Sequence, residues 1–140
     1  MSDDKLNKFG DLYREIGREL AAIVGDPDKT LLYVEADEGW VGPNVFKDEG
    51  NQIRYFDPSR KLTDLLFEVW TAEDPDKRWS AMEYTITGTK FTVEFVFPEK
   101  FGDDFDNDER RELVLQRHYG DKPRVYPPPG DMGWLLRELN

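Results

Sequence analysis

Two runs of alternating apolar and polar residues, joined through a glycine, constrain the fold of this chain more than any other stretch. They occupy residues 79–98, on either side of Thr87-Gly88-Thr89. This pattern predicts an antiparallel hairpin. Because successive strand side chains point to opposite faces, the second run forms one apolar row of Phe91, Val93, Phe95 and Phe97. We expect this row at the centre of a helix-covered sheet face, where Phe95→Ala would cost about 3–5 kcal/mol.

Helical periodicity and short β-rich runs fill the remainder of the first 120 residues. Apolar side chains recur at spacings of three and four over residues 3–24, and again up to residue 71 after a cap at Asp57 or Ser59. A third helix is expected over 108–119, with Leu113, Leu115 and His118 as anchors. Strand-like runs cover 30–36, 45–47 and 52–56, and residues 37–43 interrupt the first two. This order predicts an α+β fold with a single antiparallel β-sheet of about five strands and helices packed on one face.

A change in composition divides the chain near residue 120. We expect residues 1–120 to form a single α+β domain. Residues 121–140 contain Pro127-Pro128-Pro129, which favours an extended backbone. Apolar residues return from Met132 to Leu139. We therefore interpret 121–140 as a Pro-rich C-terminal extension that docks on the same domain.

The charge and residue content narrow the function. The net charge of −11, from 30 acidic and 19 basic residues, opposes binding to nucleic acid or anionic membranes and favours a basic protein partner. The absence of cysteine excludes disulfides, thiolate zinc sites and thiol catalysis. The chain shows neither a secretory signal nor a run of ~20 apolar residues, so we expect a soluble, cytoplasmic protein without a membrane partner.

The hairpin and its neighbours resemble a known family. The segments that carry the resemblance are Trp79-Ser-Ala-Met82-Glu-Tyr84-Thr-Ile86, Gly88-Thr-Lys90-Phe91, Phe95-Val-Phe97 and Glu109-Arg110-Arg111. Together with the preceding helix, Leu-Tyr-Val-Glu strand and leucine-rich helix, they make residues 3–119 similar to the YezG-like immunity proteins. The resemblance implies a small bacterial antitoxin that neutralises a cognate toxin, often a nuclease. It carries no catalytic residues over to this chain.

Several polar residues are candidates for chemical sites. The lone His118 has no recognisable triad partners, and we interpret it as a helix-terminal structural residue. The acids from Asp103 to Glu109 miss the spacing of a calcium-binding loop and are explained by a solvated turn and a helix cap. Glu35 lies with other acids in and between the early strands, and we interpret this group as charged turns. The sequence therefore predicts neither an enzyme nor a bound cofactor or metal.

Trp40 has two interpretations that the sequence leaves open. In Gly39-Trp40-Val41-Gly42-Pro43 it is either a protein-binding hot spot or a side chain that folds back onto the sheet. We expect a cognate, basic nuclease-type toxin to bind an aromatic and acidic surface and to be blocked sterically and electrostatically. The residues expected there are Asp37, Glu38, Trp40, Asp48, Glu49, Asp103, Asp104 and Asp106. The alternatives are a general protein-interaction or ligand-binding module without catalysis, and a metal-assisted hydrolase that uses the acidic loops.

Overall fold

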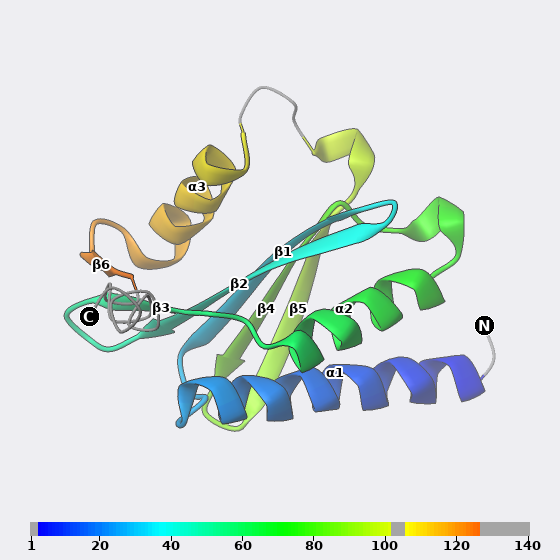
Figure 1. Cartoon of the computed structure of the whole chain (residues 1–140), viewed down its shortest axis with the longest axis horizontal. Coiled ribbons are helices and arrows are strands. Elements are labelled where there is room, and N and C mark those ends of the chain that lie inside the picture. Colours follow the sequence, from blue (N-terminus) through cyan, green and yellow to red (C-terminus); the bar gives the residue numbers. More distant parts are fainter. Residues whose placement is uncertain (1–2, 102–105, 127–140) are drawn as a thin grey trace, which may run out of the picture.

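The computed structural model describes residues 3–101 and 106–126, which form three α-helices and six strands (Figure 1). The helices are α1 (Asp3–Val24), α2 (Arg60–Ala72) and α3 (Asn107–Tyr119). The strands are β1 (Thr30–Asp37), β2 (Trp40–Asp48), β3 (Ile53–Phe56), β4 (Ala81–Thr87), β5 (Lys90–Val96) and β6 (Arg124–Val125). Two 3₁₀ turns follow α2 and β5, at Pro75–Lys77 and Pro98–Lys100. The predicted α+β class is confirmed.

The strands form one sheet in the order β5-β4-β1-β2-β3-β6. All neighbours are antiparallel except β3 and β6, which run parallel. The sixth strand is an addition to the predicted sheet, because Arg124 and Val125 align beside β3 and the Ile53 amide donates to the Pro123 carbonyl at 2.8 Å. A two-residue strand is too short to produce a recognisable alternation in the sequence.

Helices α1 and α2 lie side by side under one face of the sheet (Figure 1). Their apolar stripes meet the inward side chains of the central strands in the larger core. The helix residues fully buried there include Ile16, Leu20, Leu62, Leu66 and Val69. Ser59 accepts a hydrogen bond from the Leu62 amide and caps α2, while its hydroxyl donates to Glu19 of α1 at 2.6 Å. The cap therefore also joins the two helices.

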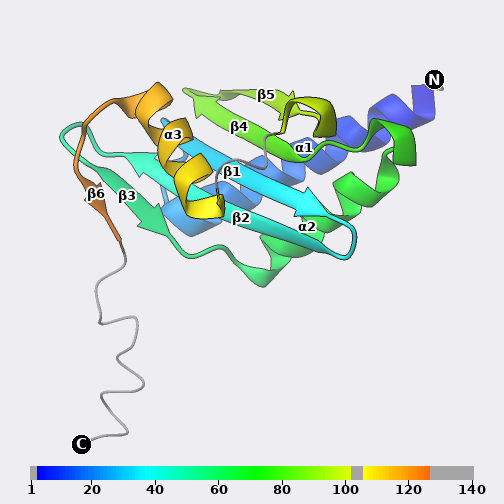
Figure 2. The ribbon, with the colours of Figure 1, turned by 90° about the horizontal axis from the view of Figure 1, so that it is seen from above.

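Helix α3 packs on the opposite face of the sheet (Figures 1 and 2), whereas the sequence pattern predicted all helices on one face. Val114 and Leu115 are buried there, but the predicted anchor Leu113 is 51% exposed. The reason is that β1 is buried on both faces. Leu31 and Tyr33 face α3, while Leu32 and Val34 face α1 and α2. Such a strand presents a continuous apolar run instead of a clear alternation.

The aromatic row of the hairpin is not at the centre of the sheet, and this prediction was wrong. Strand β5 is at the border, and β1 and β2 occupy the two central places. Phe91 and Phe97 are each 38% exposed, and Val93 and Phe95 are only partly buried. Alternation within a strand shows which face it buries, but the position of that strand in the sheet depends on pairings between distant segments.

Residues 37–43 are not an irregular interruption, which corrects a second prediction. Only Glu38 and Gly39 form the turn, and Gly39 has a φ of +84°, which suits glycine. Strand β2 then starts at Trp40, which pairs with Asp37. Pro43 is tolerated within β2 because β3 pairs only with residues 45–48, so the first half of β2 has one edge outside the β3 ladder.

Among the helices of the described ranges, none has the length and apolarity that crossing a bilayer requires.

Candidate functional site

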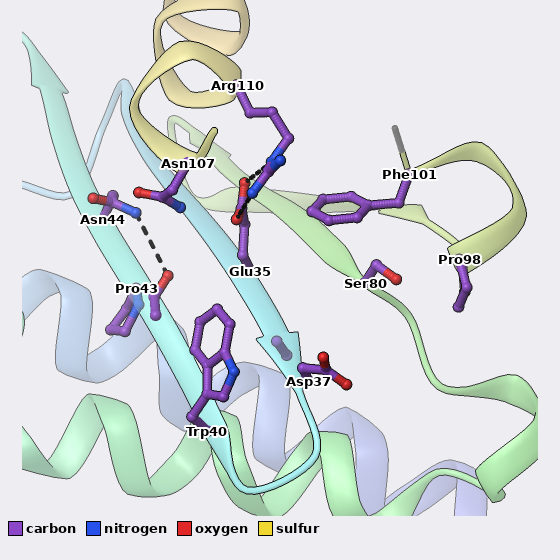
Figure 3. A pocket seen from close by; sticks show the side chains of 12 residues that line it. Glu35, Asp37, Trp40, Pro43, Asn44, Ser80, Pro98, Phe101, Asn107 and Arg110 are labelled. Atoms are coloured by element: carbon purple, nitrogen blue, oxygen red, sulfur yellow. Dashed lines mark hydrogen bonds and ion pairs between the residues drawn. The ribbon is translucent and has the colours of Figure 1, made fainter. Parts of the chain in front are cut away.

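A groove of about 700 Å³ opens between α3 and the end of the sheet that carries the β1–β2 hairpin (Figure 3). Its walls come from β1, β2, the start of α3 and the segment that follows β5. Polar and aromatic side chains converge on it. They include Glu35, Asp37, Trp40, Asn107, Arg110 and Phe101.

Glu35 forms the buried polar centre of this groove. Its side chain is only 3% exposed and receives two hydrogen bonds from Arg110, at 2.7 Å from Nε and 2.8 Å from Nη2. The Tyr33 hydroxyl donates to the same carboxylate at 2.6 Å. Burial alone would raise the pKa of Glu35, but hydrogen bonds from Arg110, Tyr33 and Asn107 outweigh it and hold that pKa below its usual value. Glu35 is therefore a buried carboxylate that binds α3, and its interpretation as a charged turn residue was wrong.

Glu83 on β4 forms a second buried contact with α3. Arg117 donates to both of its oxygens, at 3.0 and 2.6 Å, and His118 Nε2 lies 2.6 Å from Oε1. Burial would raise the pKa of Glu83, but the hydrogen bonds from Arg117 and His118 outweigh it and lower that pKa. His118 thus has the structural role that was expected of it, although its partner is a sheet carboxylate.

The two buried carboxylates explain how a polar helix packs on the sheet. Arg110 and Arg117 are seven positions apart, which places them two turns apart on the same side of α3. Glu35 and Glu83 lie on the adjacent strands β1 and β4. The Arg110 guanidinium also lies 4.4 Å from the Phe101 ring centroid, a cation–π distance. Both carboxylates hold α3 in position.

Trp40 lies at the rim of the groove and is 47% exposed. Its indole lies over Gly42, the next residue on the same face of β2. A β-carbon at Gly42 would come within 2.9 Å of the indole, so glycine leaves the space that the ring occupies. Of the two interpretations of Trp40, the structure shows a ring that is both folded onto its strand and open to solvent. Trp70 and Trp79 are buried.

A second groove, of about 670 Å³, lies between Trp40 and helix α2. Phe67 borders it and is 40% exposed. Asp64 and Glu68 border it from one side of α2, and Asp37 and Glu38 project from the nearby hairpin. We call this set the Trp40 surface: Asp37, Glu38, Trp40, Asp64, Phe67 and Glu68.

The predicted acidic residues do not form one continuous face. Asp37 and Glu38 lie at one end of β2 and Asp48 at the other, about 26 Å away if each of the eight intervening steps rises roughly 3.3 Å. Asp48 binds Lys122 at 3.0 Å, and Glu49 binds Arg54 at 3.0 Å. These two acids already have basic partners within the chain. Glu38 also has one, since Arg78 lies 3.6 Å away.

Of the acids expected in the 103–108 stretch, Asp106 caps α3. Its carboxylate accepts a hydrogen bond from the Glu109 amide at 2.8 Å, which agrees with the predicted helix cap. Asp108 pairs with Arg111 at 3.2 Å. Asp103 and Asp104 lie outside the described residues. So do Met132–Leu139, the segment of the C-terminal extension that was expected to dock.

Sequence reasoning missed the α2 half of the Trp40 surface and the partners of both buried glutamates. Phe67 lies beside the apolar stripe of α2, and its exposure depends on how α2 sits against β2. A signal for the buried ion pairs was present, since Glu35 and Glu83 interrupt strongly apolar strands and two arginines share one side of α3. A charged residue inside such a strand requires a partner. Within residues 3–101 and 106–126, no group of three His, Cys, Asp or Glu side chains is arranged to hold a metal ion.

Comparison of the sequence with protein-family models finds no match, and comparison with curated proteins finds none either.

Proposed function

We propose that this chain is a non-enzymatic immunity protein that binds a basic protein toxin through the Trp40 surface. The observation that carries the proposal is that two exposed aromatic residues, Trp40 and Phe67, line one groove at this end of the sheet together with the acidic Asp64 and Glu68. Exposed aromatic residues surrounded by polar groups are typical of the energetic centre of a protein–protein interface. The toxin as partner comes from the resemblance to the YezG-like immunity proteins.

The position of the indole supports a binding role. Trp40 stands on a strand of the sheet and covers the bare backbone of Gly42. A ring held in this way loses little conformational freedom when a partner covers it, so less of the binding free energy is spent on ordering the side chain. A partner that covers this end of β2 would contact the Trp40 ring on the α3 side of the sheet and Phe67 on the α2 side.

The charge of the surface supports a basic partner. Asp64 and Glu68 line the groove with Trp40 and Phe67, Asp37 and Glu38 lie in the adjoining hairpin, and Arg78 contacts Glu38 at 3.6 Å. The net charge of −11 adds a long-range attraction for a cationic protein. A nuclease that binds a polyanionic substrate has such a cationic surface, and a protein bound there would block access to it.

The test is co-expression with the toxin encoded beside this protein's gene. The wild-type chain should protect the host cells and co-purify with the toxin. Trp40→Ala should weaken the complex by about 30-fold or more, since truncation of an aromatic hot spot costs roughly 2 kcal/mol or more. Tyr126→Ala is the matched control, because Tyr126 is an aromatic residue of similar exposure at 44% that follows β6 and does not line the groove of Trp40 and Phe67. The control should leave affinity unchanged.

Charge-reversal variants separate the electrostatic contribution to binding from that of the aromatic side chains. Asp64→Lys together with Glu68→Lys should slow association and reduce its dependence on salt, because peripheral charges act mainly on the encounter rate. Persistent toxicity without a complex would reject the immunity role. A complex without protection would favour a general protein-interaction module instead.

A further inference from the structure

Strand β5 forms a border of the sheet with an uninterrupted ladder on one side only (Figure 2). Its seven residues pair with β4 in continuous register from Lys90 to Val96, without a bulge or a proline. The strand is also accessible, since Lys90, Phe91, Thr92 and Glu94 are exposed. Edge strands are ordinarily protected against pairing by prolines, bulges or charges, and only the charges are present in β5.

The direction of the free backbone groups follows from one hydrogen bond. The Ser80 amide donates to the Val96 carbonyl at 2.8 Å, so the backbone groups of Val96 point toward β4. Because these groups alternate along an antiparallel strand, those of Phe91, Val93 and Phe95 point outward. These three residues carry the backbone donors and acceptors of β5 that are available to another strand.

We propose that β5 pairs antiparallel with β5 of a second copy of this chain, with Thr92 opposite Thr92 on the two-fold axis. In this register Phe91 of each copy lies opposite Val93 of the other, and these are the residues with outward backbone groups. Lys90 of each copy lies opposite Glu94 of the other. The sheets of the two copies then join into one continuous sheet.

The side chains of β5 favour this register because all the pairs within the overlap of residues 90–94 are of a stabilising kind. Lys90 with Glu94 is an opposite-charge pair that the symmetry forms twice, Phe91 with Val93 is an aromatic–β-branched pair, and Thr92 pairs with itself. Phe91, which is 38% exposed and stacks on Tyr84, would gain a neighbour on its open side. A register centred on Val93 has the same backbone pattern, but it places Lys90 opposite Val96 and Glu94 opposite Thr92. Charge complementarity therefore selects the register centred on Thr92.

This dimer is independent of the proposed function. Strands β4 and β1 separate β5 from β2, which carries Trp40, so pairing at β5 involves none of the residues of the Trp40 surface. The net charge of −11 on each copy opposes association, but salt at physiological strength screens charges that are more than about 8 Å apart. The paired Lys90 and Glu94 side chains are close enough to retain their attraction.

Charge-reversal variants at Lys90 and Glu94, made in the full-length chain, test the pairing. The molar mass is measured by light scattering after size-exclusion chromatography. Wild-type protein should have twice the chain mass of 16.4 kDa. Lys90→Glu alone, or Glu94→Lys alone, places like charges opposite each other twice and should give monomer. An equimolar mixture of these two variants should recover the dimer, since each copy then meets opposite charges, and the double variant should recover it too.

A cysteine at position 92 tests the register, in a chain that has no cysteine of its own. Thr92→Cys should form an intermolecular disulfide under mild oxidation, because directly opposed residues bring their Cα atoms within disulfide range. Lys90→Cys is the control and should not cross-link, because each Lys90 opposes Glu94.

Three outcomes would overturn the proposal. They are a monomeric wild-type chain at high micromolar concentration, a dimer that both single reversals leave intact, and a failure of the mixed variants to associate. Cross-linking at Lys90→Cys but not at Thr92→Cys would reject the register. The single variants should have the circular dichroism spectrum of the wild-type chain, because the substituted positions are exposed, and this control would show that they fold.

Discussion

At the scale of single residues, Glu35 shows how a charged side chain can be fixed inside an apolar strand. Its carboxylate exchanges water for two bonds from Arg110 and one from Tyr33. The pair with Arg110 is mostly buried, with side-chain exposures of 3% and 20%. The carboxylate–guanidinium geometry is bidentate, which makes the pair both strong and specific in orientation.

Glu35→Gln should therefore lower the free energy of unfolding by about 3 kcal/mol, because it leaves the buried part of Arg110 without its counter-charge. Urea denaturation measures the loss. Glu15→Gln is the matched control, since Glu15 pairs with Arg18 at positions where the side chains are 39% and 68% exposed, and it should cost less than about 1 kcal/mol. Equal losses at the two positions would contradict the structural role given to Glu35.

The surroundings of Gly17 reverse the stabilising effect that alanine usually has over glycine inside a helix. A β-carbon at Gly17 would lie 2.8 Å from the Tyr84 hydroxyl, which donates to the Tyr13 carbonyl at 2.7 Å. The glycine lets Tyr84 reach the backbone of α1. At Gly10 the nearest atom is the end of the flexible Arg14 side chain, at 3.4 Å.

We predict opposite signs for alanine at these two glycines. Gly10→Ala should stabilise the protein by up to about 1 kcal/mol through helix propensity. Gly17→Ala should destabilise it, because the steric conflict with Tyr84 outweighs the same gain. Thermal unfolding measures both. In a Tyr84→Phe background, which removes the hydroxyl, Gly17→Ala should lose most of its penalty, and a penalty that persists there would reject the explanation.

At the scale of elements, α3 differs from α1 and α2 in what attaches it to the sheet. Two buried apolar residues, Val114 and Leu115, anchor it, and Arg110, Arg117 and His118 add ion pairs to the buried carboxylates of Glu35 and Glu83. Helices α1 and α2 depend instead on broad apolar stripes. Docking of α3 is therefore the part of the fold most sensitive to protonation.

Acid should weaken this docking first. Because the pKa values of Glu35 and Glu83 are lower in the folded protein than the ordinary value of 4.5, the unfolded chain binds more protons as the pH falls. The stabilisation is complete above that value and is lost as the pH drops through the folded pKa values. Melting temperature, measured from about pH 7 to about pH 3, should fall below about pH 4.5.

The melting temperature of the double variant Glu35→Gln/Glu83→Gln should fall less over the same pH range. It should retain some dependence, since the pKa of Asp48 is also lowered: burial would raise it, but hydrogen bonds from the Gly50 amide and Lys122 outweigh this. A double variant with the wild-type slope would show that α3 docking is not the acid-sensitive step.

The elements that could be predicted from the sequence are those fixed by local signals. The periodicity of α1, the Ser59 cap of α2 and the alternation around Gly88 all predicted elements that the structure contains. The position of Phe91 to Phe97 at the border could not be predicted, because it depends on β4 pairing with β1 across about 50 residues of chain. Trp40 stood out in the sequence as an aromatic residue between two glycines that either binds a partner or folds back onto the sheet. Phe67 lines a groove with it only through the packing of α2.

At the scale of the whole molecule, acidic residues are spread over separate regions with different roles. Asp48 and Glu49 bind Lys122 and Arg54 at one end of β2, while Asp106 caps α3. The acids of the Trp40 surface lie at the other end of the sheet. The net charge of −11 thus describes a molecule-wide attraction for cations, and the two aromatic rings make one region of that surface distinct.

The exposed indole of Trp40, which lies on Gly42, also gives the protein an intrinsic fluorescence signal for binding. Trp70 and Trp79 are 5% and 2% exposed, so a collisional quencher such as acrylamide reaches them poorly, whereas Trp40 is open to it. Replacing Trp134 by phenylalanine leaves these three emitters. In that background, quenchable emission comes from the ring at the hairpin tip, and its shielding measures occupancy of that surface without any attached dye.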